Sequence, residues 1–503
     1  MNCLQLLINT VEKNPDKPAV VFRGEPITYS ALWLNIKKFA KGLSDRGIGP
    51  GSHVALLLGN SPHYIISYFG VLATGATVVP LNPQYKDKEL AFILNNADAH
   101  AVIYVDLLEP IIQLAKPNLE TTSLFIEVSA TNPACTWNQI IASEPIEAIG
   151  ERAENSIAQI LYTSGTTGTP KGVMLSDENL AWMAELIVRE LNVWEEDRIK
   201  VVLPIFHTLA KMAGLWAPFT IGATIYLEER FVPDDVLEQI EKEEITVFYG
   251  VPAMFALFLM SPKLKDYDYS SLRLFGSGGA SIPVEIIERI QAVFPVKLSE
   301  AYGQTEATIM ITCQPLNGEK VPGSVGQRVE GIDLRIVDPN DLDVPQGEVG
   351  EIVFKGKNAM LGYYKNPEAT AATVRNGWVH TGDLAYEDVN GNIFIVDRIK
   401  DMIIRGGYNV YPREIEEVLF KHPAIVECAV IGEPHEILGE EIVAYIVAKE
   451  EVSEEALVNF CKENLANFKV PRSFRFLDAL PKNATGKILK EPLKKMVKES
   501  PVQ

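Results

Sequence analysis

Short β-branched apolar runs alternate with longer helical stretches through most of the chain. Such runs fit buried strands, and the stretches between them fit helices that pack on a core. Strands that alternate with helices are typical of parallel sheets covered by helices, so we expect a layered α/β fold. Strands are predicted at residues 54–58, 77–80, 101–105, 157–162, 200–203, 224–227, 247–249 and 272–276, and helices at residues 64–73 and 88–95.

The pattern changes after about residue 320, where Gly-rich turns separate short strands. These strands, at residues 333–337, 351–355 and 393–396, predict a β-rich subdomain. Beyond Lys400 the pattern becomes compact α+β, with helices at residues 412–420 and 453–465 and strands at residues 425–432 and 441–448. We expect a large N-terminal domain over residues 1–398, a connection at residues 399–401 and a small domain over residues 402–503.

The chain of 503 residues has 66 acidic and 46 basic side chains, which gives it a net charge of −20. A surface of this sign repels nucleic-acid backbones and anionic membranes, so no nucleic-acid partner is expected. The excess is uneven, because residues 399–503 carry 15 basic and 17 acidic side chains, which supports a boundary near residue 400. The five cysteines form no C-x-x-C pair and the seven histidines form no ligand-spaced cluster, so neither disulfides nor a zinc site are expected.

The uncharged stretch at residues 54–85 is long enough to raise the question of a membrane span. Gly and Pro interrupt it at residues 59–62, 74–75 and 80–83, so we predict a strand, a helix and a strand within a core. The N-terminus lacks the basic and apolar regions of a signal peptide. We therefore expect a cytoplasmic protein with no transmembrane segment, and the sequence permits a homodimer.

The string YTSGTTGTPKG at residues 162–172 follows a predicted strand and carries the strongest chemical signal. Glycines let the backbone approach a polyphosphate, hydroxyls and amides donate to its oxygens, and Lys171 adds a positive charge. Pro170 stands where a P-loop has glycine before its lysine, and Gly172 where it has a hydroxyl. The string therefore predicts a phosphate-binding loop that is not a P-loop.

This string resembles the phosphate-loop signature of the adenylate-forming superfamily, which includes the acyl-CoA synthetases. The resemblance covers nearly the whole chain, because seven further signatures follow in order: LPIFH (203–207), SGGA (277–280), YGQTE (302–306), WVHTGD (378–383), DRIKD (397–401), GGYNVYPREIE (406–416) and PKNATGK (481–487). It implies a two-step reaction with ATP, Mg²⁺ and coenzyme A. A carboxylate first attacks the α-phosphate of ATP to give acyl-AMP and pyrophosphate, and the thiol of coenzyme A then expels AMP.

The resemblance also implies which residues bind the nucleotide. Tyr302 would stack on adenine, Asp383 would accept hydrogen bonds from the ribose, and Glu306 with Thr163 would hold Mg²⁺ between phosphates. Lys487 would neutralise charge where the carboxylate meets the α-phosphate, as a preorganised cation can. The full nucleotide set is Thr163, Ser164, Gly165, Thr166, Thr167, Gly168, Lys171, Gly279, Ala280, Tyr302, Thr305, Asp383 and Arg398, and the catalytic set is Lys487, Glu306, His207 and Thr163.

By the same resemblance the small α+β domain is mobile, and Lys400 is its hinge. Rotation about the hinge would present Lys487 for the first step. For the second step it would withdraw Lys487 and bring Gly406 and Gly407 to line a channel for coenzyme A.

The acyl pocket implied by the resemblance is formed by His207, Tyr249, Gly278, Ala301, Gly303, Thr308 and Met310. Gly278 and Ala301 leave room for a flexible chain, and no aspartate near His207 is present to pair an amino group. We expect a medium- or long-chain fatty acid. Lys211 is expected to face solvent, and the alternative is that it pairs a second carboxylate of a dicarboxylic substrate.

Three alternatives to a fatty acyl-CoA synthetase stay open. An aryl- or dicarboxylate-CoA ligase shares every motif, and a fatty acyl-AMP ligase would pass its product to a carrier protein. A nucleotide-binding pseudoenzyme would show a broken phosphate loop, Glu306 or Lys487, and all three are intact in the sequence.

Overall fold

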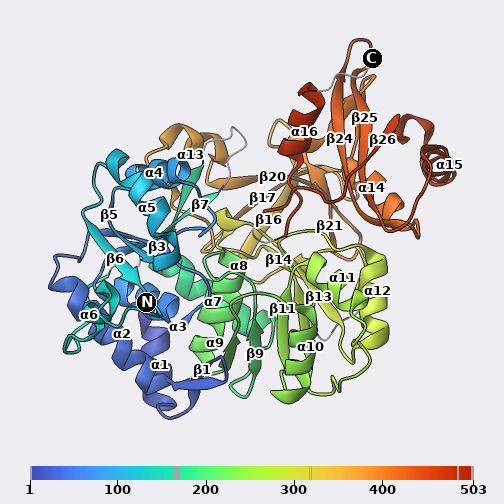
Figure 1. Cartoon of the computed structure of the whole chain (residues 1–503). Helices are drawn as coiled ribbons and strands as arrows, with labels where there is room; N and C mark the ends of the chain where they lie inside the picture. The colour runs from blue at the N-terminus through green and yellow to red at the C-terminus, as the bar shows by residue number, and fades with distance from the viewer. Residues whose placement is uncertain are drawn as a thin grey trace.

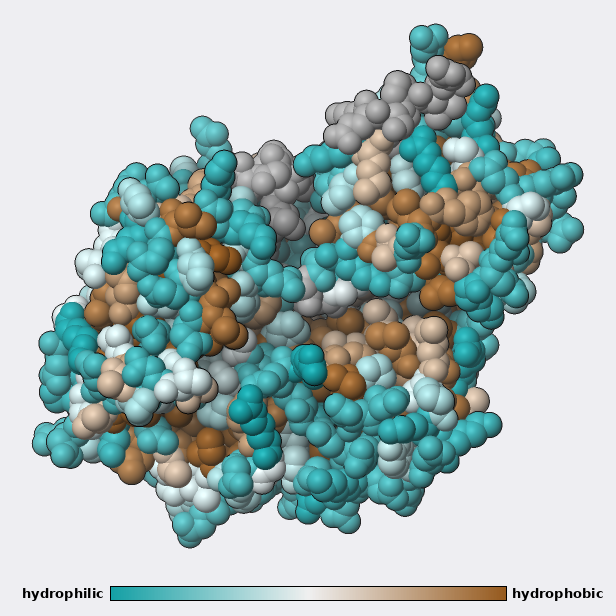
Figure 2. Space-filling view, viewed as in Figure 1, coloured by the Kyte–Doolittle hydropathy of each residue, from teal (hydrophilic) through white to brown (hydrophobic). Residues whose placement is uncertain are grey.

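The computed structural model describes residues 3–152, 155–163, 170–316, 318, 320–483 and 486–499. A large domain carries the blue to yellow segments of Figure 1, and a smaller domain in orange and red stands at one end of it. Figure 2 shows this face of the molecule hollowed between the two domains. Within the described ranges, no helix combines the length and the apolar character that crossing a membrane requires.

The larger of two parallel-type sheets in the big domain has nine strands in the described part of the chain. Its central strands run parallel, and antiparallel strands close both edges. In spatial order they are β15 (Gln327–Arg328), β14 (Thr312–Cys313), β13 (Leu298–Tyr302), β12 (Leu274–Ser277), β11 (Val247–Gly250), β9 (Arg198–Val201), β10 (Thr224–Leu227), β1 (Pro18–Phe22) and β2 (Glu25–Thr28).

The second sheet has seven strands among the described residues, parallel except at the edge formed by β8 and β18. Their order is β18 (Gly362–Tyr363), β8 (Lys171–Ser176), β7 (Ile157–Thr163), β4 (Thr77–Pro80), β3 (His53–Leu57), β5 (Ala99–Val105) and β6 (Leu124–Val128). The strands predicted at 77–80 and 224–227 are β4 and β10, with the same bounds. The predicted layered α/β fold is confirmed.

Helices pack between the two sheets, and α3 (Pro62–Ala73) among them is apolar on all sides. Residues 64–73 of α3 are all buried. Trp216 packs edge-on against Phe69 of α3, with ring centroids 4.9 Å apart, and so ties α3 to the helical segment that follows His207. Helices of this region are α1 (Leu4–Lys13), α2 (Tyr29–Ser44), α3, α6 (Thr136–Ile141), α7 (Asp177–Glu190), α8 (Thr208–Lys211), the π-helix η3 (Met212–Trp216) and α9 (Ala217–Ile221).

The outer faces of both sheets carry amphipathic helices and separate apolar cores. Phe248, Phe255 and Phe275 form one such core beneath the nine-stranded sheet. The outer helices are α4 (Asp87–Asn96), η1 (Asp106–Leu108), α5 (Glu109–Ala115), η2 (Lys116–Asn118), α10 (Pro233–Lys242), α11 (Pro252–Met260) and α12 (Val284–Val293), and η4 (Thr305–Ala307) follows β13.

The predicted β-rich subdomain is an antiparallel five-stranded sheet. Its strands are β16 (Ile332–Val337), β17 (Gly350–Gly356), β19 (Val374–Arg375), β20 (Trp378–Glu387) and β21 (Ile393–Arg398), with α13 (Pro367–Thr373) beside them. The turn η5 (Ile399–Asp401) connects β21 to the small domain.

The small domain is α+β, as expected, and surrounds its own apolar core. Its long hairpin of β24 (Ile425–His435) and β25 (Gly439–Ala448) belongs to a sheet of five strands in the described residues, in which β25 also pairs with β22 (Ile403–Arg405) and β26 (Ser473–Phe476). The other elements are β23 (Tyr408–Val410), α14 (Pro412–Phe420), α15 (Glu454–Asn464), η6 (Asn467–Lys469) and α16 (Lys490–Glu499).

Candidate active site

The predicted phosphate loop joins two antiparallel strands of the seven-stranded sheet. Thr163 ends β7 and pairs directly with Lys171, which begins β8. Ser164, Gly165, Thr166, Thr167 and Gly168 lie outside the described residues. The Lys171 ammonium lies 5.0 Å from the centre of the Tyr363 ring, so an aromatic face holds this cation at the base of the loop.

Tyr363 also binds the predicted magnesium carboxylate. Its hydroxyl donates to Glu306 Oε1 at 2.9 Å, and Glu306 is partly buried in η4. Burial raises the pKa of Glu306, although the hydrogen bond from Tyr363 acts in the opposite direction. The structure thus brings Lys171 and Glu306 to the same tyrosine ring.

A second group lies where β13, β20 and β21 meet, and it consists of Tyr302, Asp383 and Arg398. The Tyr302 hydroxyl donates to Asp383 Oδ2 at 2.7 Å, and Arg398 Nε lies 3.2 Å from Asp383 Oδ1. Asp383 and Arg398 are also register partners on β20 and β21. Asp383 is only 6% exposed, so its carboxylate depends on Arg398 for a balancing charge and on Tyr302 for a hydrogen bond.

Lys487 of the small domain reaches this group from across the domain boundary. Burial, the largest cause, and the positive charge of Arg398 lower the pKa of its ammonium to about 8, while Asp383 acts in the opposite direction. An added Cβ at the preceding Gly486 would lie 3.9 Å from Val251 and Ala253, at the start of α11. The C-terminal turn therefore rests against the large domain, with its lysine beside the predicted ribose residues.

The other predicted nucleotide residues lie at strand ends on the same side. Gly279 and Ala280 follow β12 and are exposed, and Gly279 has a left-handed backbone with φ +80°. An added Cβ there would lie 3.8 Å from Val251. Thr305 begins η4, directly after the β13 strand that carries Tyr302. The parallel strands thus deliver several motifs to one edge of the sheet, where ligands of such folds bind.

His207 caps the helical segment that runs between the two sheets. It is partly buried, and burial, the largest cause, together with the charge of Lys211 lowers its pKa to about 4. The histidine is therefore neutral at neutral pH. The side chain of Leu209, two residues on, lies within 3.7 Å of an added Cβ at Gly278, which is also 3.6 Å from the Ala301 carbonyl. The structure thus groups Gly278 and Ala301 under this helix.

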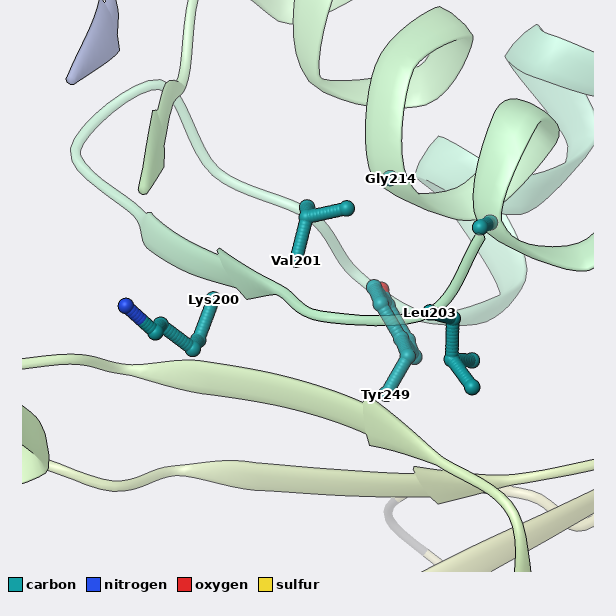
Figure 3. Close-up of a pocket in the computed structure, with 6 residues that line it drawn as sticks. Lys200, Val201, Leu203, Gly214 and Tyr249 are labelled. Atoms are coloured by element: carbon teal, nitrogen blue, oxygen red, sulfur yellow. The ribbon is translucent and has the colours of Figure 1, made fainter. Parts of the chain in front are cut away.

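A cavity of about 10 Å³ lies between this helix and the nine-stranded sheet (Figure 3). The ring of Tyr249 points from its strand toward the helix, and the ammonium of Lys200 points away from the other labelled side chains. That ammonium pairs with Glu228 at 2.7 Å. The lining residues are Lys200, Val201, Leu203, Ala210, Gly214 and Tyr249, of which Tyr249 was predicted.

Lys211 does not face solvent, so this expectation is wrong. Its side chain is fully buried, and its ammonium donates to Gln159 Oε1 at 3.0 Å and lies 5.1 Å from the centre of the Tyr68 ring. The reason is that the helix is enclosed on both sides: its Ala210 and Gly214 face the nine-stranded sheet, while Lys211 faces the seven-stranded sheet.

Three predicted pocket residues on the loop after β13 make close contacts with Ile309 or Asn358: Gly303, Thr308 and Met310. An added Cβ at Gly303 would lie 1.7 Å from the Ile309 carbonyl oxygen, so this glycine permits a close backbone approach. The Thr308 hydroxyl donates to the Asn358 carbonyl at 2.8 Å, and Asn358 Nδ2 donates to the Met310 carbonyl at 3.1 Å. Asn358 and Tyr363 were missed because no motif contains them.

Gly406 and Gly407 form the left-handed turn between β22 and β23, with φ of +59° and +86°. The Gly406 amide donates to the Leu438 carbonyl at 2.8 Å within the small domain. Added Cβ atoms at the two glycines would meet no atom of the large domain within 4 Å. In this orientation the turn at Gly486, and not the turn of Gly406 and Gly407, lies against the large domain. Lys400, in η5, is exposed.

Comparison with known proteins decides the family. Residues 7–364 match the model of the AMP-binding enzyme family, and residues 414–487 match that of the AMP-binding enzyme C-terminal domain. The chain belongs to the AMP-binding enzyme family. The predicted membership of the adenylate-forming superfamily is thereby confirmed, and this AMP-binding enzyme is an acid–thiol ligase.

The relatives of this AMP-binding enzyme differ in the acids they are named for. A long-chain-fatty-acid–CoA ligase of Bacillus subtilis is 35% identical, over 97% of this chain and 93% of its own. An anthranilate CoA ligase, AuaEII, solved with anthranoyl-AMP, is 30% identical with a TM-score of 0.94 and covers 99% of this chain and 98% of its own. Both chains are matched over nearly their full length.

The AMP-binding enzyme MatB of Rhodopseudomonas palustris has been solved in two states. Its ATP-bound structure is 31% identical to this chain, covers 99% of both chains and gives a TM-score of 0.93. Its apo structure, with the same identity and coverage, gives 0.82. The arrangement described here is therefore more similar to the ATP-bound state.

Proposed function

We propose that the chain is an ATP-dependent acyl-CoA synthetase that forms an acyl-AMP at the group around Lys487. The observation that supports it best is the position of Lys487 beside Asp383 and Arg398, with the C-terminal turn seated on the large domain. A cation from the mobile domain, placed where two anions must meet, supplies charge compensation that water cannot preorganise.

In the first step the acid lies beside His207 and its carboxylate oxygen attacks the α-phosphate, expelling pyrophosphate. The backbone of residues 163–171 and the Lys171 ammonium bind the phosphates. Tyr302 covers the adenine, and Asp383 accepts hydrogen bonds from the ribose. Lys487 stabilises the negative charge that gathers between the carboxylate and the α-phosphate. Orientation and charge compensation carry the catalysis, without a protein nucleophile.

Glu306 and Thr163 are the residues that would hold Mg²⁺. No cluster of three acidic, His or Cys side chains suited to a metal is found in the described ranges. One carboxylate such as Glu306 suits an ion that takes most of its ligands from phosphate oxygens and water. A bound cation would also offset the burial that raises the pKa of Glu306. The ion would neutralise phosphate charge when bound.

In the second step the small domain rotates about Lys400, with residues 399–401 as the hinge. Lys487 leaves, and the turn of Gly406 and Gly407 replaces it along the path of the thiol. The coenzyme A sulfur then attacks the acyl carbonyl, and AMP leaves. The exposure of Lys400 and the open space beside Gly407 support this movement.

Two substrate classes have support. The relative named long-chain-fatty-acid–CoA ligase supports the medium- or long-chain fatty acid expected from the sequence. The burial of Lys211 supports the dicarboxylic alternative, because the expectation of a fatty acid assumed that Lys211 faces solvent. Aryl acids and transfer to a carrier protein remain the other outcomes of the test.

The test is AMP formation with MgATP across monocarboxylic, dicarboxylic and aromatic acids, with and without coenzyme A. Acid-dependent AMP formation that requires coenzyme A is expected. Acyl-AMP that accumulates while coenzyme A stays unused would instead indicate a carrier-loading ligase. Lys487→Ala serves as the matched variant, and it should lower acid-dependent pyrophosphate release by about 10²- to 10³-fold while acyl-AMP added directly is still converted to the thioester.

A further inference from the structure

The strand that carries Asp383 has an irregular register with its neighbour. β20 pairs with β17 on both sides of residues 381–383, but these three residues stand opposite the single residue Ile352 of β17. The extra residues form a bulge that ends at Asp383. Bulges are frequent next to active sites, where they change the direction in which a side chain points.

Two side chains hold the backbone of this bulge. Gly382, at its centre, has a left-handed backbone with φ +71°, and its amide donates to Glu351 Oε1 at 2.9 Å. The Thr381 hydroxyl donates to the Ile352 carbonyl at 2.8 Å and accepts from the Asp383 amide at 3.1 Å. Backbone groups that leave a ladder need other partners, and Glu351 and Thr381 supply them here.

Glu351 is itself held in place by two basic side chains. Its Oε2 lies 2.9 Å from His380 Nδ1 and accepts from an Arg375 guanidinium nitrogen at 3.4 Å. Its side chain is 15% exposed. Each carboxylate oxygen of Glu351 therefore has a partner, and charged hydrogen bonds of this kind fix the orientation of the group.

The contacts of the Asp383 carboxylate depend on where the bulge places its backbone. Tyr302, which donates to Asp383 at 2.7 Å, lies on β13, and Arg398, at 3.2 Å, lies on β21. Because these partners belong to other strands, they do not follow Asp383 if the bulge relaxes. A shift of β20 would therefore break the group that the candidate site presents to the ribose.

We infer that Glu351 is a positioning residue for nucleotide binding, which acts through the Gly382 amide to fix the bulge that directs Asp383 at the ribose. This inference rests on the proposed function, in which Asp383 accepts hydrogen bonds from the ribose hydroxyls. It assigns part of ribose recognition to a carboxylate that contacts the backbone beside Asp383.

The experiment compares the affinities of the full chain for MgATP and for its 2′-deoxy and 3′-deoxy analogues by isothermal titration calorimetry, without any acid. Loss of a hydrogen bond to a carboxylate predicts that wild type binds at least one analogue about 10- to 100-fold more weakly than ATP. Asp383→Ala should bring this ratio close to one, and Glu351→Ala should remove most of it. The double variant should show no further loss, because both changes act on one contact.

Two further variants test the route through the bulge. Glu351→Gln keeps an acceptor oxygen for the Gly382 amide and should retain part of the ratio. Thr381→Val removes the other bond to the bulge at similar side-chain volume and should also lower the ratio, which keeps the test valid if Glu351→Ala does not fold. Glu348→Ala is the matched control, since Glu348 is exposed just before β17, and it should show the wild-type ratio.

The outcomes separate this inference from the proposed function. If Asp383→Ala lowers the ratio while folded Glu351→Ala and Thr381→Val keep it, the inference is wrong and the proposed ribose contact stands. If Glu351→Ala weakens ATP and both analogues equally, Glu351 supports the fold of the subdomain and not ribose recognition. If Asp383→Ala leaves the ratio unchanged, the proposed role of Asp383 fails.

Discussion

Individual charged residues in this protein are tuned by how far they are removed from water. Burial lowers the pKa of Lys487 to about 8, and it raises the pKa of Glu306, because in both cases the charged form loses hydration. Lys487 has Asp383 nearby, whereas Lys211 has only neutral partners in the described structure. Burial therefore acts on both lysines, and only Lys487 has an acidic residue near it in the described structure.

The pKa of Lys487 predicts how the first step depends on pH. Adenylation needs the ammonium form, and the fraction in that form falls as pH rises through about 8. We expect kcat/KM for acid-dependent ATP–pyrophosphate exchange to decline above that pH, since this parameter reports the free enzyme. Lys487→Ala should lower it by about 10²- to 10³-fold and remove the decline.

Lys487→Arg is the control, because a guanidinium stays charged throughout this range. Its exchange activity should be lower than wild type but flat across the same pH values. A decline of the same shape in Lys487→Arg and in wild type would mean that another group titrates.

At the scale of elements, the loop after β13 holds a strained backbone at the candidate site. Thr308 has φ 56° and the β-branched Ile309 has φ 146°, both in the region that side chains disfavour. Asn358 ties the loop on both sides, through the Thr308 hydroxyl and the Met310 carbonyl. Strain of this kind persists where surrounding contacts overdetermine it, and here those contacts fix Glu306 within the loop.

Gly303→Ala tests how tightly this loop is packed. A methyl group there would lie 1.7 Å from the Ile309 carbonyl oxygen, and backbone cannot yield as a flexible side chain can. We expect a loss of about 1–3 kcal/mol in the free energy of unfolding and a marked loss of ATP-dependent activity.

The measurement is urea unfolding together with pyrophosphate exchange. Gly59→Ala is the matched control, since an added Cβ there meets nothing within 4 Å and its φ is not positive. Wild-type stability in Gly303→Ala would show that the Ile309 carbonyl moves aside without cost.

At the scale of the whole molecule, polar contacts hold the small domain against β21. Arg413 is the second residue of α14, and its amide donates to Asp397 Oδ2 at 2.9 Å while its guanidinium donates to the Ile395 carbonyl at 2.7 Å. Glu300 of β13, 4% exposed, lies in the field of the same arginine, and its burial raises its pKa to about 8. These contacts belong to the orientation that resembles ATP-bound MatB.

Arg413→Ala should weaken that orientation selectively. We expect the rate of adenylation to fall by about tenfold or more, as the loss of a charged hydrogen bond predicts, while conversion of added acyl-AMP to the thioester falls less. Single-turnover assays of each half-reaction measure the difference. Lys421→Ala, at an exposed position just after α14, is the control. Equal losses in both half-reactions would assign Arg413 to stability alone.

Much of the fold could be predicted from local sequence. Strands at 77–80 and 224–227 and the helix at 412–420 have the predicted bounds, because hydrophobic periodicity and turn residues act within a few positions. The motifs led to Tyr302, Asp383 and Arg398, which the structure brings into direct contact. Tyr363 and Asn358 could not be found in this way, since their partners are 57 and 48 positions away.

The sequence by itself determined the layered α/β fold, the small α+β domain and the family, because each rests on residue types and spacings within short segments. Only the tertiary structure decided that Lys211 is buried, that Gly303 lies against the Ile309 carbonyl and that Lys487 lies near Asp383. The physical reason is that burial and electrostatic environment are set by neighbours distant in the chain, such as Gln159, 52 positions before Lys211.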